Sequence, residues 1–81
     1  MAWFEFFWSP EIEEHVAANN VTIGEFEEVV SNAKEVQRSR SSGDPLVTGY
    51  TSEGRFLICV FRYIDDFTIE PVTAFEPTPR D

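Results

Sequence analysis

The sequence predicts an α+β fold of the order β-α-α-β-β-β-β, in which two N-terminal helices pack on a mostly antiparallel sheet. Three observations support this fold class. An aromatic run at residues 2–8 is typical of a strand, and two apolar stripes at helical spacing follow between residues 10 and 33. Residues 54–75 then contain two apolar, strand-like runs joined by a polar turn.

The hairpin at residues 54–75 is expected to form the centre of the sheet. Its first strand, Phe56–Tyr63, consists mainly of β-branched and aromatic residues. Both faces of this strand are apolar, so we expect it to be central, with little solvent on either side. The second strand, residues 67–75, contains Pro71, which has no N–H to donate to a ladder. We therefore expect Pro71 at an edge, at a bulge or where its nitrogen faces solvent, in a less central strand.

The composition is that of a small globular domain. The chain has 81 residues, of which 42% are hydrophobic and 15% aromatic, including eight Phe. At this size a single core is only just sufficient, and large rings compensate by burying much area each. We expect one domain at residues 1–75 and a flexible C-terminal tail at residues 76–81, where two prolines occur without an apolar anchor.

Charge and cysteine content restrict the classes of function. Fifteen acidic residues against six basic ones give a net charge of −9, which disfavours RNA because nucleic-acid binders usually present a basic face. The single cysteine, Cys59, excludes an internal disulfide and is expected in the core. With no signal peptide and no long apolar run, we expect a cytoplasmic protein without membrane contact. No residue pattern predicts a metal or a cofactor.

The first strand and the first helix follow from local patterns. In residues 2–8 the even positions Phe4, Phe6 and Trp8 share one side, which we expect to face the core; an exposed docking patch is the alternative. Ser9 and Pro10 are typical of the N-cap and first position of a helix, which should run from Pro10 to about Ala18. Asn19 and Asn20 can take the left-handed conformation that ends helices.

The second helix begins with a capping box formed by Thr22 and Glu25. An apolar stripe should pack on the sheet; it consists of Phe26, Val29, Val30 and Ala33. The glutamates of this helix, Glu25, Glu27 and Glu28, are interpreted as its solvated face. Acid–base chemistry by paired carboxylates is the alternative.

The polar segment at residues 35–41 alternates and is expected to form a strand that carries Arg38 and Arg40 on one side. A loop at residues 41–45, a strand at residues 46–50 and a turn at residues 51–54 follow. Gly54 is free to adopt positive φ in that turn, which leads into the central hairpin.

An ordered set of short motifs from Trp8 to Phe75 resembles the BrnT-like family, toxins of type II toxin–antitoxin systems related in fold to the RelE ribonucleases. The motifs are Trp8-Ser9-Pro10-Glu11, Glu14-His15-Val16, Asn20-Val21-Thr22 with Glu25, Arg38-Ser39-Arg40-Ser41, Gly49-Tyr50-Thr51 with Gly54-Arg55-Phe56-Leu57, and Ile69-Glu70-Pro71-Val72-Thr73-Ala74. The resemblance implies a RelE/BrnT-like helix-on-sheet domain that cuts RNA without a metal and is silenced by an antitoxin.

Such cleavage needs an acid and a base near the scissile phosphate and cations for its developing charge. On the matching positions, the resemblance implies that Arg55 holds the phosphate, supported by Arg38 and Arg40. His15, the single histidine, is the imidazole candidate, because imidazole titrates near neutrality. Its alternative role is that of a hydrogen-bonded packing residue beside the acids of its own helix.

The chain departs from the family pattern at positions that matter for catalysis. The family's His-Gly before the second helix is Asn19-Asn20 here, the terminal Arg is Phe75, and the basic helix that follows it has no counterpart. Two hypotheses result. The first is a catalytically degenerate toxin-fold domain that acts as a protein-binding or regulatory module, with an antitoxin-like or other protein partner. The second is an active metal-independent endoribonuclease that cleaves mRNA.

Overall fold

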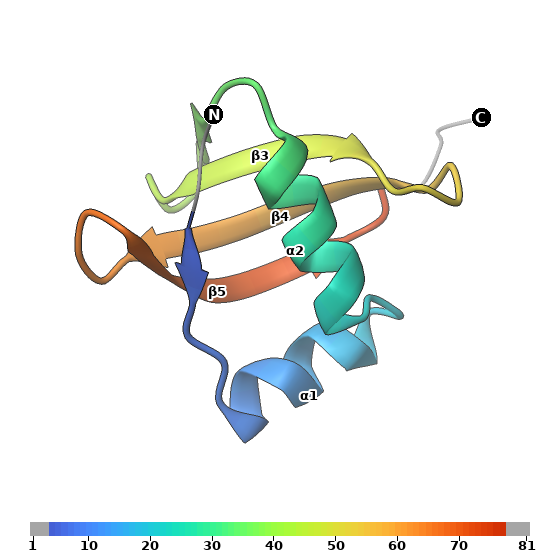
Figure 1. The fold of residues 1–81 in the computed structure, drawn as a ribbon, viewed down its shortest axis with the longest axis horizontal. Coiled ribbons are helices and arrows are strands. Elements are labelled where there is room, and N and C mark those ends of the chain that lie inside the picture. The colour runs from blue at the N-terminus through green and yellow to red at the C-terminus, as the bar shows by residue number, and fades with distance from the viewer. Residues whose placement is uncertain (1–3, 78–81) are drawn as a thin grey trace.

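A computed structural model of the chain describes residues 4–77, and it confirms the predicted α+β class and element order (Figure 1). The elements are β1 (Glu5–Phe6), α1 (Pro10–Ala18), α2 (Ile23–Asn32), β2 (Gln37–Arg38), β3 (Pro45–Tyr50), β4 (Phe56–Tyr63) and β5 (Thr68–Phe75). Within the described residues the strands form one mixed sheet of order β1-β5-β4-β3-β2. The strand predicted to be central, β4, is the middle one.

The two outer strands are shorter than the sequence predicts. The segment at residues 2–8 pairs only through β1, which runs parallel to β5 with Glu5 opposite Thr68; residues 2 and 3 lie outside the described part. The segment at residues 35–41 pairs only through β2. It stops there because the chain turns at once: the Ser39 N–H donates to Asp44 O at 2.7 Å, and the Gly43 N–H donates back to Ser39 O at 2.9 Å.

Both helix starts are confirmed in atomic detail. The Ser9 hydroxyl accepts the Ile12 N–H at 3.2 Å, and α1 runs from Pro10 to Ala18 as predicted. Thr22 and Glu25 form the complete capping box, with hydrogen bonds of 3.1 and 3.0 Å. Asn20 has φ +63, a left-handed conformation that Asn tolerates better than most residues, and it ends the α1 segment.

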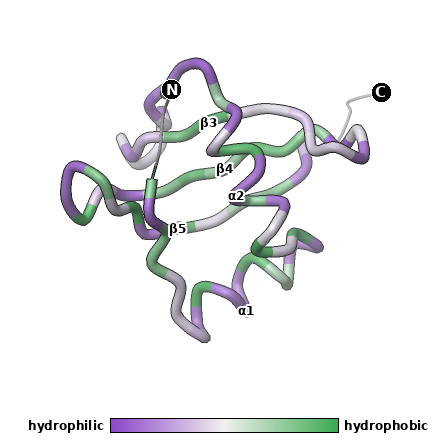
Figure 2. Tube along the Cα trace, viewed as in Figure 1, coloured by the Kyte–Doolittle hydropathy of each residue, from purple (hydrophilic) through white to green (hydrophobic). Residues whose placement is uncertain are grey.

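The core lies between the helices and one face of the sheet. Figure 1 shows α2 crossing the sheet and α1 beside β5, and Figure 2 shows hydrophobic residues along β4 and hydrophilic ones in the β4–β5 turn. The buried cluster consists of Val16, Val21, Phe26, Val29, Val30, Val47, Leu57, Cys59, Phe61, Ile69 and Ala74. The predicted inward side of the first segment is confirmed, because Phe4, Phe6 and Trp8 pack against this cluster.

The position of Pro71 matches its prediction. In the β4–β5 ladder Val60 faces Thr73, but the next residue, Phe61, faces Pro71, so Val72 forms a bulge. Pro71 lies beside this bulge and beyond the two β5 residues that β1 pairs. Because Pro71 lies beside the bulge, its lack of an N–H interrupts no regular stretch of the ladder.

The expectation that both faces of β4 are shielded is wrong for one face. Leu57, Cys59 and Phe61 point to the helices and are fully buried, whereas Phe56 and Ile58, on the other face, stay partly exposed. Both helices pack on the same side, since Val16 of α1 belongs to the same cluster as the α2 residues. No described helix covers the second face of the sheet.

Candidate functional site

The turn before β4 positions Arg55, the residue expected to hold phosphate. The buried Thr51 hydroxyl accepts the N–H groups of Glu53 and Arg55 at 3.3 and 3.2 Å, and the Thr51 N–H donates to Arg55 O at 2.8 Å. Gly54 adopts φ +85, as predicted, which strongly favours glycine. This hydrogen-bonded turn directs the Arg55 side chain towards the start of α2.

The Arg55 guanidinium is held by groups of its own chain. Its Nη1 donates to Glu25 Oε2 at 2.8 Å, to Glu25 Oε1 at 2.9 Å and to the Asn20 carbonyl at 2.9 Å. Its Nη2 lies 3.2 Å from Glu76 Oε1. Glu76 belongs to the predicted flexible tail, of which residues 78–81 lie outside the described part. Two carboxylates thus face one cation.

The ion pair with Arg55 and the capping box share one carboxylate, that of Glu25. Burial acts to raise the pKa of Glu25, but hydrogen bonds from the Thr22 N–H and from Arg55 outweigh it and hold the pKa below its ordinary value. The hydrogen bond to Glu25, in turn, raises the pKa of Arg55. These contacts of Glu25 and Arg55 join the start of α2, the turn at Asn20 and the start of β4. The role of the two residues here is therefore structural.

Arg38 and Arg40 do not lie near Arg55 in the sheet. Arg38 pairs with Pro45 at the first residue of β3, whereas Arg55 precedes Phe56, which pairs with Tyr50 at the last residue of β3. Five residues of extended strand separate these ends by about 17 Å. Arg38 donates to Gly43 O at 3.0 Å and closes its own loop, and Arg40 is exposed in the turn that follows.

His15 is exposed on α1 and lines a shallow hollow with Glu11, Glu14 and Ala18, all of its own helix. No arginine lines this hollow. The four predicted site residues therefore do not converge on one point: Arg55 lies at one end of the sheet, Arg38 and Arg40 at the other, and His15 on α1. Among residues 4–77, no group of three His, Cys, Asp or Glu side chains is arranged to hold a metal ion.

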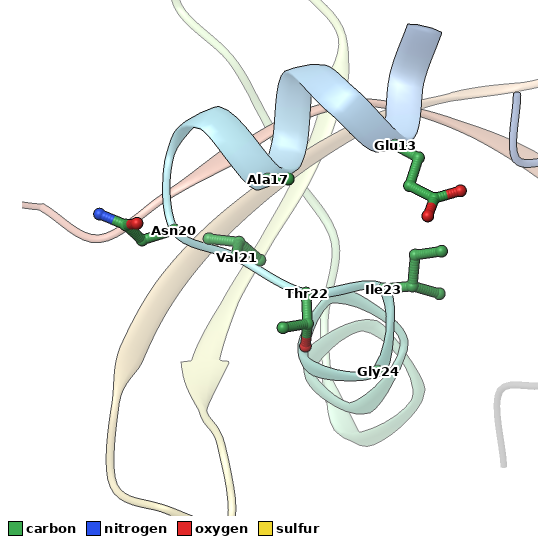
Figure 3. Close-up of a pocket in the computed structure, with 7 residues that line it drawn as sticks. All are labelled: Glu13, Ala17, Asn20, Val21, Thr22, Ile23 and Gly24. Atoms are coloured by element: carbon green, nitrogen blue, oxygen red, sulfur yellow. The ribbon is translucent and has the colours of Figure 1, made fainter. Parts of the chain in front are cut away.

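A hollow of about 560 Å³ lies between α1 and the start of α2 (Figure 3). Its lining residues are Glu13, Ala17, Asn20, Val21, Thr22, Ile23 and Gly24. Glu13 is the one titratable side chain among them. A single exposed carboxylate beside small and apolar groups offers no acid–base pair, so this hollow has no evident chemistry.

The position at which the resemblance implies a histidine, Asn19, has a structural contact instead. The Asn19 side-chain amide donates to Ala74 O at 3.0 Å and lies 3.5 Å from Thr73 Oγ1, which ties the end of α1 to β5. The sequence predicted that Asn19 and Asn20 end the helix, but no local pattern predicted this long-range hydrogen bond. The next position, a glycine in the family, is Asn20 with its positive φ.

The sequence suggested that the α2 glutamates form a solvated face. The structure shows that they also make tertiary hydrogen bonds. Besides Glu25, Glu27 accepts the indole N–H of Trp8 at 2.9 Å. Glu28 accepts the Ser52 N–H at 3.0 Å. These three acids anchor α2 to the segment after β1, to the β3–β4 turn and to the start of β4, and their role is tertiary packing. Their partners lie 19 to 30 residues away in the sequence, beyond the reach of a local pattern.

Comparison with known proteins adds no assignment. No protein-family model, no curated protein and no solved structure matches the chain. None of the described helices is long and apolar enough to cross a membrane.

Proposed function

We propose that this chain is a catalytically degenerate BrnT-like domain that acts as a protein-binding or regulatory module. The proposal rests mainly on the ion pairs of Arg55. Its guanidinium already bonds Glu25 and lies against Glu76, so a phosphate would have to displace one carboxylate and then lie beside the other.

The distribution of the remaining charges supports the absence of catalysis. A phosphorane needs several cations within reach of the same oxygens. Arg38 and Arg40 lie at the opposite end of β3 from Arg55, and the chain as a whole carries a net charge of −9. Long-range electrostatics therefore repels RNA rather than attracting it.

Protein binding is supported by the second face of the sheet. Its middle is apolar, no described helix covers it, and it carries exposed rings. Contiguous apolar patches of this kind on small soluble domains mark interaction sites.

Incubation of the purified protein with a mixed mRNA substrate without divalent metal tests the proposal. We expect RNA to stay intact at high protein concentration, both for the wild type and for Arg55→Ala. Discrete cuts made by the wild type and abolished in Arg55→Ala, with the exposed Lys34→Ala as the matched control for removal of one positive charge, would establish the endoribonuclease instead.

A further inference from the structure

The uncovered face of the sheet has a defined set of side chains. Strand alternation and the ladder register place on it every second residue of the three long strands, opposite the buried cluster. The uncovered face consists of Leu46, Thr48, Tyr50, Phe56, Ile58, Val60, Thr73 and Phe75, with the ladder pair Arg62 and Glu70 at one end. Val60 is only 7% exposed yet lies outside the helix-side cluster, so neighbours on this second face shield it.

Apart from the Arg62–Glu70 ladder pair at one end, no side chain of the uncovered face is charged, although 26% of the residues of the chain are. Antiparallel sheets with one wet face usually alternate apolar and polar residues, and β4 does not. Tyr50 is 68% and Phe75 39% exposed, and the Tyr50 and Phe56 rings lie 5.0 Å apart, centroid to centroid. The uncovered face therefore has the character of a core surface that lacks its second layer.

The two ends of the uncovered face differ. At one end, Arg62 pairs in the ladder with Glu70; its side chain is 62% exposed, and its Nε is 3.7 Å from Asp44 Oδ1. At the other end lie the rings of Tyr50 and Phe56. A weakly held guanidinium at one end and two aromatic rings at the other are complementary groups, because cations bind the faces of rings.

We propose that the partner of the uncovered face is a second copy of this chain. This inference rests on the proposed protein-binding function and names its surface and its partner. The two sheets pack face to face around a two-fold axis that lies between them and runs perpendicular to β4. That axis places the Arg62 end of each copy over the Tyr50 and Phe56 end of the other and aligns the apolar middle of the two faces.

Charge favours this partner over a basic one. A basic partner would need acids spread over its contact surface, and the uncovered face offers one, Glu70, beside Arg62 at one end. The uncharged middle of the face is instead matched by an identical one, and Arg62 then meets rings rather than a second cation.

The size of the uncovered face predicts a weak dimer. Three strands about 4.8 Å apart and four alternate rows about 6.8 Å apart give a footprint of roughly 400 Å² for each copy. Two copies then bury roughly 800 Å² in total, which is typical of weak, transient contacts. Self-association should therefore be concentration-dependent and visible only at high protein concentration.

The response to salt separates the two kinds of partner. Each copy carries a net charge of −9, so two copies repel one another over long range, and screening by salt should strengthen the dimer. Binding of a basic protein to the same acidic chain would weaken as salt rises.

Sedimentation equilibrium of the full chain up to about 1 mM, in low and in physiological salt, tests the proposal. We expect a reversible dimer that is tighter at the higher salt and weakened at least about tenfold by Tyr50→Lys. Phe67→Lys is the matched control, because Phe67 is 65% exposed in the β4–β5 turn and is not one of the residues of the uncovered face, so this variant should leave the dimer intact. Circular dichroism and urea unfolding establish that both variants are folded.

The outcomes are distinguishable. A monomer at every concentration, a dimer that tightens as salt is removed, or equal effects of Tyr50→Lys and Phe67→Lys would overturn the proposed dimer. A monomer that binds a different protein, with that binding abolished by Tyr50→Lys, would leave the proposed protein-binding function in place and remove only this inference. Cleavage of RNA by a dimer would remove the proposed function and leave the dimer.

Discussion

The side-chain amide of Asn19 donates a hydrogen bond of 3.0 Å to the main-chain carbonyl of Ala74, 55 residues away. The hydrogen bond fastens the C-terminal end of α1 to β5, the strand that β1 pairs over only two residues. The position at which the resemblance implies an acid–base histidine therefore has an amide that stabilises the fold.

Replacing Asn19 tests this role. Asn19→Ala should lower the free energy of unfolding by about 1 kcal/mol, because the Ala74 carbonyl then has no side-chain donor. Urea denaturation measures the change, and Asn32→Ala, at an exposed residue at the end of α2, serves as control. Equal unfolding midpoints for Asn19→Ala and the wild type would show that the hydrogen bond contributes nothing.

The capping box at α2 leads to a second prediction. Thr22→Ala should destabilise the chain by about 1 kcal/mol, whereas Thr22→Ser, which keeps the hydroxyl that accepts the Glu25 N–H, should be close to neutral. Thermal and urea unfolding of the two variants compare these effects. The prediction fails if serine and alanine are equally destabilising.

Stability at acid pH should depend on Glu25. Its pKa in the folded chain lies below its ordinary value, so the ionised group stabilises the fold above an unfolded-state pKa of about 4.3. This contribution is lost as the pH falls through the lower folded-state value. We expect the unfolding midpoint to fall less steeply with acid in Glu25→Gln than in the wild type, with Glu14→Gln, on an exposed α1 position, as control.

Phe26 should be among the most sensitive core positions. It is 0% exposed and meets Trp8 and Phe6 edge-on, with centroid distances of 5.4 and 6.3 Å. Phe26→Ala should cost about 3–5 kcal/mol, a large fraction of the stability of a small domain. Phe67→Ala, which removes a ring that is 65% exposed, should change the unfolding free energy by much less. Similar destabilisation at both positions would contradict the described core.

Cys59 should be unreactive in the folded chain. Burial raises the pKa of its thiol to about 12, and the side chain is fully buried in the middle of β4. Labelling with a thiol reagent near neutral pH should therefore be slow in native buffer and fast in denaturant. Rapid labelling of the folded protein would show that β4 opens or that Cys59 is accessible.

The local features of this protein follow from its amino-acid sequence without reference to the fold. The Ser9 cap, the Thr22–Glu25 box and the Gly54 turn each depend on residues within a few positions of one another, and all three form as predicted. The central position of β4 was also predicted from its composition, because a run that is apolar on both faces is typical of an interior strand, although only one face of β4 is covered.

Which charged groups meet, and which surfaces remain open, depends on the three-dimensional arrangement. Arg55 bonds Glu25 because the β3–β4 hairpin and the start of α2 lie at the same end of the sheet, and Arg38 lies far from both because β2 pairs with the other end of β3. These distances depend on strand order and register, which a one-residue shift would change and which no short motif encodes. The uncovered face has the same origin, since both helices pack on one side of a strand whose two faces are almost equally apolar.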